Sequence, residues 1–258
     1  CYEGRTDVVK LLLGHSNKEV DLNARDNYGW TALLCACSNG HKDVVKLLLD
    51  HSERIELNAR NNTGHTAFIF ACYEGHTDVV KLLLGHPVKI IDLNERDNYG
   101  WTALLSACSN GHKDVVQVLL EHSKRIDLNA KDKKGRTAFI AACNFGQKDI
   151  VILLLNRSDR IELNARDNYG KTAFMAACLH GHRDVVKLLL KNSDIELNAR
   201  NDEGSTAFMY ACFHGHKDVV QLLLDHSERI ELNARANNGD TALMLACRRG
   251  HKDVVQLL

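Results

Sequence analysis

The chain has 258 residues with balanced charge, 33 Lys and Arg residues against 33 Asp and Glu residues. This balance argues against a general electrostatic affinity for nucleic acid or anionic lipid, which requires a clustered basic surface. The unbroken apolar runs fall far short of the roughly 20 residues that a membrane helix requires, and no signal peptide is visible. We therefore expect neither nucleic-acid binding nor membrane insertion.

One pattern of about 35 residues returns along the whole chain. Its Thr-Ala pair recurs at steps of 34 to 36 residues, at Thr31, Thr66, Thr102, Thr137, Thr172, Thr206 and Thr241. A repeat of this period is typical of stacked supersecondary units that each contact only their neighbours. We predict a single domain over 1–258, with complete repeats at 26–60, 61–96, 97–131, 132–166, 167–200 and 201–235 and partial repeats at 1–25 and 236–258.

The repeat at 26–60 indicates what each unit forms. Residues 26–29, Asp-Asn-Tyr-Gly, are typical of a turn, in which Asp bonds the backbone ahead of it and Gly supplies the left-handed position. Thr31 then offers an N-cap for a short helix that ends at Gly40. A second helix buries its Val and Leu side chains, and an extended arm at 55–58 leads into the next turn. The sequence therefore predicts an all-α stack of helix-turn-helix units with projecting turns.

The cysteines follow the same period. Eight of the nine fall at one phase of the repeat: Cys1, Cys37, Cys72, Cys108, Cys143, Cys178, Cys212 and Cys247. Equivalent residues of packed helices lie roughly 8–10 Å apart, whereas a disulfide needs Cα atoms within about 7 Å. We predict reduced, small core residues, which fits a cytoplasmic or otherwise intracellular location.

The histidines are also mostly tied to the repeat. Eleven of the fourteen fall at two fixed phases, which predicts structural roles as caps and loop bonds, and His65, His180 and His214 lie outside these phases. Zinc needs four converging ligands, so a site built from His180, His182, His214 and His216 is not favoured, because such pairs diverge along a stack. Phosphate-loop, serine-hydrolase and zinc-hydrolase motifs do not occur. We predict no metal, no cofactor, no catalytic residue and no enzyme activity.

The pattern G-x-T-A-[LF]-x-x-A-C-x-x-G-H-x-D-V-V-x-L-L-L, followed by L-N-A-R-D, resembles the ankyrin repeat over essentially the whole chain. Two features depart from that family. The Thr-Pro-Leu-His start appears as Thr-Ala-Leu-Leu, Thr-Ala-Phe-Ile or Thr-Ala-Phe-Met, and the loop after the second helix is about two residues longer. The resemblance implies an ankyrin-repeat solenoid whose finger tips and concave first-helix face bind partners.

Positions that vary between the repeats are the candidates for partner binding. They are the turn tip, the residue after the turn glycine, and the two residues after the Ala-Cys pair. Aromatic and charged side chains there suit protein recognition, since Tyr, Trp and Arg dominate interface energies. The candidates are Tyr28, Trp30, His65, Tyr73, Glu74, Tyr99, Trp101, Lys133, Lys134, Arg136, Phe145, Tyr169, Lys171, His180, Asp202, Glu203, Phe213, His214, Arg248 and Arg249.

The leading hypothesis is a scaffold that binds a protein or peptide partner through the concave helix face and finger tips. The alternative is a structural spacer or elastic segment of a larger protein, without a dedicated partner. End-to-end self-association through uncapped terminal repeats is a third hypothesis. For Tyr28, Tyr99 and Tyr169, and for Trp30 and Trp101, the alternative to partner binding is packing between neighbouring fingers.

Overall fold

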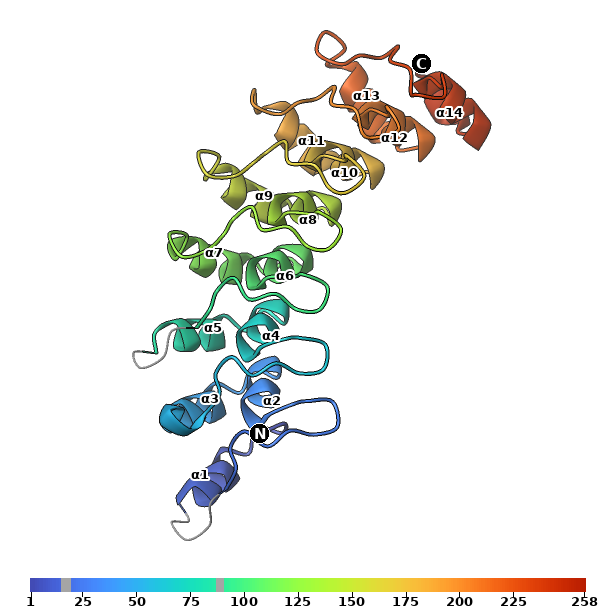
Figure 1. Ribbon diagram of the computed structural model, residues 1–258. Coiled ribbons are helices and arrows are strands. Elements are labelled where there is room, and N and C mark those ends of the chain that lie inside the picture. The colour runs from blue at the N-terminus through green and yellow to red at the C-terminus, as the bar shows by residue number, and fades with distance from the viewer. Residues whose placement is uncertain (15–19, 87–90) are drawn as a thin grey trace. The chain divides into compact units, whose positions relative to one another are not determined.

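The computed structural model describes residues 1–14, 20–86 and 91–258. Its contacts divide the chain into two compact units, Cys1–Asp132 and Lys133–Leu258. Within the described ranges the elements are fifteen α-helices and one short 3₁₀ helix, and no strand is present (Figure 1). None of these helices combines the length and the apolar character that crossing a membrane requires.

In the first unit, the helices form two rows. The row of first helices consists of α2 (Ala32–Ser38), α4 (Ala67–Tyr73) and α6 (Ala103–Asn110), with α2 against α4 and α4 against α6. The other row consists of α1 (Thr6–Gly14), α3 (Lys42–Leu49), α5 (Thr77–Leu84) and α7 (Lys113–Glu121), with the 3₁₀ helix η1 (Ser52–Arg54) after α3.

The second unit repeats this arrangement. Its first helices are α8 (Ala138–Asn144), α10 (Ala173–Leu179), α12 (Ala207–Phe213) and α14 (Ala242–Arg249), each against the next. Its second helices are α9 (Lys148–Leu155), α11 (Arg183–Leu190), α13 (Lys217–Leu224) and α15 (Lys252–Val255). The two rows confirm the predicted all-α stack of helix-turn-helix repeats.

Local hydrogen bonds explain why each repeat folds in this way. The Asp26 carboxylate accepts the backbone N–H groups of Tyr28 and Trp30, at 2.9 and 2.8 Å, and so closes the turn. The Thr31 hydroxyl caps α2 by accepting the backbone N–H three residues on, at 3.3 Å. Gly40 follows the helix with φ of 70°, a left-handed conformation that favours glycine. These features confirm the predicted turn, cap and helix end.

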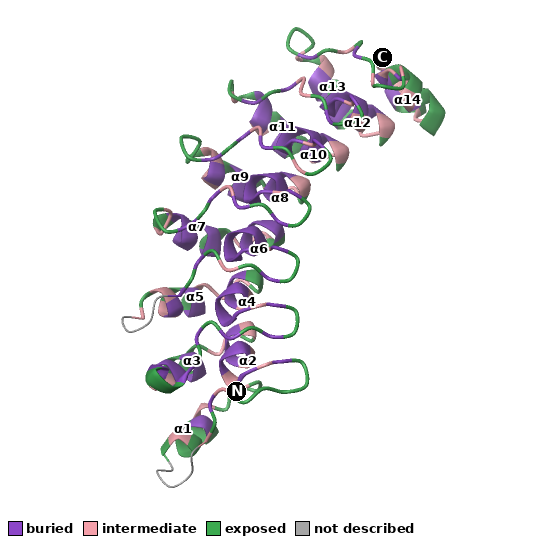
Figure 2. Ribbon diagram, viewed as in Figure 1, coloured by how far each residue is buried: buried purple, intermediate pink, exposed green. Residues whose placement is uncertain are grey.

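The core lies between the two rows. In α3, Val44, Val45, Leu48 and Leu49 are buried and Lys46 is exposed, as the sequence predicts. Figure 2 shows the same division along each unit, with buried segments on the sides of the helices that face each other. Burial of these Val and Leu side chains is the main source of stability, at roughly 1.5–3 kcal/mol for each fully buried side chain.

Most of the repeated cysteines belong to this core. Six are buried: Cys37, Cys72, Cys108, Cys143, Cys178 and Cys212. Burial raises the pKa of the Cys72 thiol well above its ordinary value, so it stays neutral. The prediction of a core position is wrong for Cys1, which is half-buried ahead of α1, and for Cys247, which is exposed because α14 packs on a first helix at one side only.

The histidines of the Gly-His phase join neighbouring repeats. The His76 side chain makes no cap bond to its own helix, and its Nε2 instead bonds the Ser38 carbonyl of the preceding repeat at 3.0 Å. A Cβ atom on Gly40 would lie only 2.6 Å from His76 Nδ1, so glycine is also required for this approach. The predicted structural role is confirmed, but its form is a bridge between repeats and not a helix cap.

A second set of bonds joins the fingers. At the second position of the turn, an Asn side chain donates its Nδ2–H to the backbone carbonyl of the same position in the preceding repeat. These bonds, of 2.9–3.0 Å, join Asn62 to Asn27, Asn98 to Asn62, Asn168 to Lys133 and Asn237 to Asp202. We call this set the asparagine ladder. Asp202 stands at the same position but has no amide hydrogen to donate.

Candidate partner-binding surface

None of the predicted partner-binding residues lies in the core. All are exposed or half-buried, and they occupy the fingers and the ends of the first helices. The half-buried members are Trp30, His65, Trp101, Arg136, Lys171 and Phe213. All but Phe213 follow a turn glycine. The position directly after the turn glycine is therefore partly covered.

The tyrosines at the finger tips are the most exposed of the Tyr, Trp and Phe candidates. Tyr28, Tyr99 and Tyr169 are 72%, 63% and 60% exposed. Their backbone N–H groups are held by the Asp side chain of the turn, at 2.9 Å for Tyr28. The alternative that these rings pack between neighbouring fingers is therefore wrong.

The first unit carries an aromatic cluster on its first-helix side. The rings of Trp30 and Phe70 stack with centroids 4.5 Å apart, and His65 stacks on Phe70 at 4.7 Å. Tyr73 meets His65 edge-on at 6.5 Å, and His65 Nε2 lies 3.3 Å from the Asp97 carboxylate. Burial lowers the pKa of His65, although Asp97 opposes this shift. The packing alternative thus holds for Trp30, whose ring is shared between two repeats.

Sequence reasoning missed Phe70 and Tyr210 as site residues. Both occupy the first-helix position of Cys35, which also varies between the repeats and was the available signal. The side chain after the turn glycine of one repeat contacts this helix position of the next repeat where Trp30 meets Phe70 and where Lys171 meets Tyr210. We call these two positions the finger–helix pair.

In the second unit, the finger–helix pair of Lys171 and Tyr210 joins a cation to an aromatic ring. Lys171 Nζ lies 5.5 Å from the centroids of both Tyr210 and Tyr169, within the range of a cation–π interaction. The Tyr210 hydroxyl accepts a hydrogen bond from Asn201 Nδ2 at 2.9 Å. Burial, reinforced by the Glu203 carboxylate, raises the pKa of Tyr210 to about 12.

Two arginines at the end of α14 are held in different ways. Arg249 lies over the Phe213 ring at 4.0 Å, and His214 meets the same ring edge-on at 4.9 Å. Arg248 instead forms two hydrogen bonds with the Asp240 carboxylate, at 2.6 and 2.8 Å. These bonds hold the pKa of Asp240 below its usual value. Arg248 is thus neutralised by a carboxylate, and Arg249 is not.

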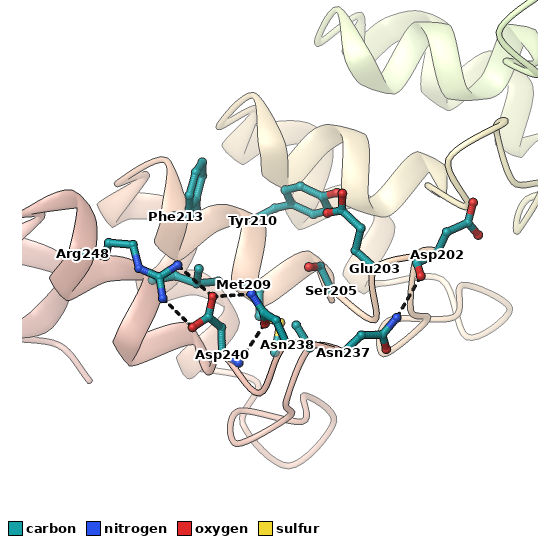
Figure 3. Close-up of a pocket in the computed structure, with 12 residues that line it drawn as sticks. Asp202, Glu203, Ser205, Met209, Tyr210, Phe213, Asn237, Asn238, Asp240 and Arg248 are labelled. Atoms are coloured by element: carbon teal, nitrogen blue, oxygen red, sulfur yellow. Dashed lines mark hydrogen bonds and ion pairs between the residues drawn. The ribbon is translucent and has the colours of Figure 1, made fainter.

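A pocket of about 610 Å³ opens between the last two repeats of the second unit (Figure 3). In Figure 3 the Arg248–Asp240 pair and Glu203 with Tyr210 stand at different sides of it. The finger–helix pair here is Ser205 with Leu245, and the space stays open because Ser replaces the larger Trp, His or Lys of other repeats. Four predicted residues line the pocket: Asp202, Glu203, Phe213 and Arg248.

His180 and His214, which lie outside the fixed phases, each lie near the histidine two residues further on. Among the described residues, no group of three or more His, Cys, Asp or Glu side chains is placed to hold a metal ion. Ring centroids are 6.0 Å apart for His180 and His182, and 6.0 Å apart for His214 and His216. The Nε2 atom of His216 is already bonded to the Leu179 carbonyl at 2.8 Å.

Large apolar side chains are also exposed on α1 and on α14. Among them are Val8, Leu11 and Leu12 on α1, and Leu243 and Met244 on α14. Self-association through these helices stays a prediction.

Comparison with protein-family models gives matches over nearly the whole chain. A model described as "Ankyrin repeats (3 copies)" matches residues 53–132, 124–201 and 193–258. A second, described as "Ankyrin repeats (many copies)", matches residues 1–49. No curated protein matched the chain.

Proposed function

Because the chain belongs to the ankyrin-repeat family, we propose that it is a scaffold that docks a protein or peptide on its finger tips and first helices. Ankyrin repeats are generally protein–protein interaction modules, and their all-helical fold is typically non-catalytic. One observation carries the proposal. The twenty candidate side chains, all at positions that differ between the repeats, are exposed or half-buried, whereas the repeated Thr, Val and Leu side chains supply caps and core.

The chemistry of this surface supports the same function. The finger-tip tyrosines are rigid amphipathic side chains, which gain contact area at low entropic cost when a partner covers them. The pocket beside Phe213 has a volume typical of sites that receive an anchoring group, which are roughly 300–1,000 Å³. Aromatic rings and arginines close to such a hollow are frequent centres of binding energy.

Capture with matched variants tests this function. The front variant combines Phe145→Ser with Lys171→Gln, and the back variant combines Ile152→Ser with Lys187→Gln. Phe145 and Ile152 are exposed in the same repeat, Phe145 at the end of α8 and Ile152 on α9. We expect a partner captured saturably by the wild-type chain to be lost from the front variant and kept by the back variant, with both folded by circular dichroism.

Two outcomes would contradict the proposal. Equal loss from both variants would mean that the first-helix side is not the binding surface. If no protein binds the wild-type chain saturably, the spacer alternative would replace the scaffold.

A further inference from the structure

Two cationic side chains of the second unit contact aromatic rings instead of pairing with carboxylates. Lys171 Nζ lies over Tyr169 and Tyr210, and the Arg249 guanidinium lies over Phe213. Neither cation forms an ion pair within the described parts of the chain. A ring face orders the side chain without neutralising its charge, so both cations are already placed to meet an anion from outside.

His180 adds to this positive surface. It caps the end of α10 and is exposed, with its ring 6.0 Å from that of His182. Burial against the helix end lowers the pKa of His180, and the groups that act on it electrostatically are His182, His216 and Lys171. Every one of these neighbours is basic, so a proton on His180 is disfavoured by them.

His214 has the same surroundings one repeat later. It caps the end of α12, beside Phe213. Burial lowers the pKa of His214, and the groups acting on it are His216, His180, Arg249 and His251. These too are all basic.

Lys171, His180, His214 and Arg249 therefore form one cluster across three consecutive repeats, which we call the basic–aromatic patch. Its members influence one another in pairs, Lys171 with His180, His180 with His214, and His214 with Arg249. The nearby Asp240 does not neutralise it, because Arg248 holds that carboxylate through two hydrogen bonds. The Glu203 and Asp167 carboxylates act on Tyr210, the ring beneath Lys171, but neither forms an ion pair with a member of the patch among the described residues. The cations of the patch can therefore accept an anion from outside.

We propose that the basic–aromatic patch binds an acidic segment of a partner protein. This inference rests on the proposed scaffold function and specifies the chemistry of the partner. Asp or Glu carboxylates of the segment bind Lys171 and Arg249 through charge-assisted hydrogen bonds. His180 and His214 each take up one proton from the solvent as the complex forms, while the carboxylates remain ionised.

Selection from a displayed library of random 12-residue peptides, with the whole chain as bait, tests this inference. We expect the bound peptides to be enriched in Asp and Glu, and we expect Lys171→Gln combined with Arg249→Gln to abolish that enrichment. The matched control is Arg183→Gln combined with Lys187→Gln, which removes the same charges from the exposed side of α11 and should leave the enrichment intact.

The possible outcomes distinguish a failure of the acidic-segment inference from a failure of the proposed scaffold function. Selected peptides without acidic enrichment, or enrichment that persists in the Lys171 and Arg249 variant, would overturn the inference and leave the scaffold function standing. If no peptide is selected at all, the scaffold function fails with it. A 12-base-pair DNA duplex that displaces a selected acidic peptide at equal affinity would overturn the assignment to a protein partner.

The affinity of a selected acidic peptide should also depend on pH. Binding raises the pKa of His180 and His214, so affinity increases as pH falls from 8 to 6. The increase is up to about tenfold for each histidine whose pKa rises by one unit. The variant with His180→Gln and His214→Gln should bind with little pH dependence, and an equally flat profile in the wild-type chain would refute the proton uptake.

Discussion

Replacement of Asp202 by Asn is expected to stabilise the second unit. In the asparagine ladder, Asn168 and Asn237 each donate Nδ2–H to a carbonyl of the preceding repeat, at 2.9 and 3.0 Å. Asp202 keeps the same orientation, because a Cβ atom on Gly170 would lie 2.4 Å from its Oδ1, close to the 2.3 Å that separates Asn168 Oδ1 from such an atom on Gly135. The second carboxylate oxygen of Asp202 therefore takes the place of the donating nitrogen. It faces the backbone carbonyl oxygen of the preceding repeat, and two acceptors cannot form a hydrogen bond.

The expected gain follows from the exposure of the site. A neutral intramolecular hydrogen bond contributes about 0.5–1.5 kcal/mol net. Asp202 is exposed, so water can satisfy the unpaired carbonyl in the wild-type chain, and the gain belongs in the lower part of that range. A gain of this size corresponds to a rise in melting temperature on the order of 1–4 °C for a chain of this length.

Urea unfolding followed by circular dichroism measures the effect, and two further variants identify its cause. Asp202→Ala removes the facing acceptor without adding a donor, so its stability should fall between those of the wild type and Asp202→Asn. Asn168→Asp should lower stability by breaking the existing bond to Lys133. If Asp202→Asn is no more stable than Asp202→Ala, the restored hydrogen bond contributes nothing and the reasoning from the ladder is refuted.

Three further predictions concern the caps, the bridges and pH. Thr172→Ala removes the side-chain cap of α10 and should cost about 1 kcal/mol in urea unfolding, whereas Thr172→Ser should keep most of it. His216→Ala leaves the part-buried Leu179 carbonyl without its 2.8 Å bond and should cost about 1 kcal/mol. His216→Gln, which can still donate, should recover part of this. The pKa of His65 is lowered in the folded chain, so the unfolded chain binds the proton more readily; stability should be complete above pH ~6.5 and fall as pH drops below it. Urea titrations from pH 8 to 5 should show this fall, with a smaller slope in His65→Gln, and equal slopes would contradict it.

The elements that the sequence predicted are those determined by short-range contacts. The Asp26 turn and the Thr31 cap each involve residues no more than four positions apart. Helical periodicity predicts that Val44 and Val45 lie on one apolar face of the helix. Any repeat that stacks against this face buries them. Because such features depend only on the repeat itself, they are predicted in every repeat that keeps these residues.

Features that join two different repeats were not predictable in the same way. The bridge from His76 to the Ser38 carbonyl spans 38 residues, and the sequence indicated only that the histidine is structural. Trp30 was expected to be exposed, but its neighbour Phe70 differs from the residue at that position in other repeats and offers a ring to stack on. The burial of a variable side chain therefore depends on a second variable side chain.

The character of this surface is consequently set by finger–helix pairs. A single position does not determine it. Trp30 with Phe70 gives a closed aromatic stack, Lys171 with Tyr210 gives an unpaired cation on a ring, and Ser205 with Leu245 leaves an open pocket. Each pair takes one side chain from each of two repeats, so a substitution in one finger changes the surface presented by the next helix. We therefore expect partner recognition on such a stack to be coupled between neighbouring repeats, even though the core of each repeat is nearly the same.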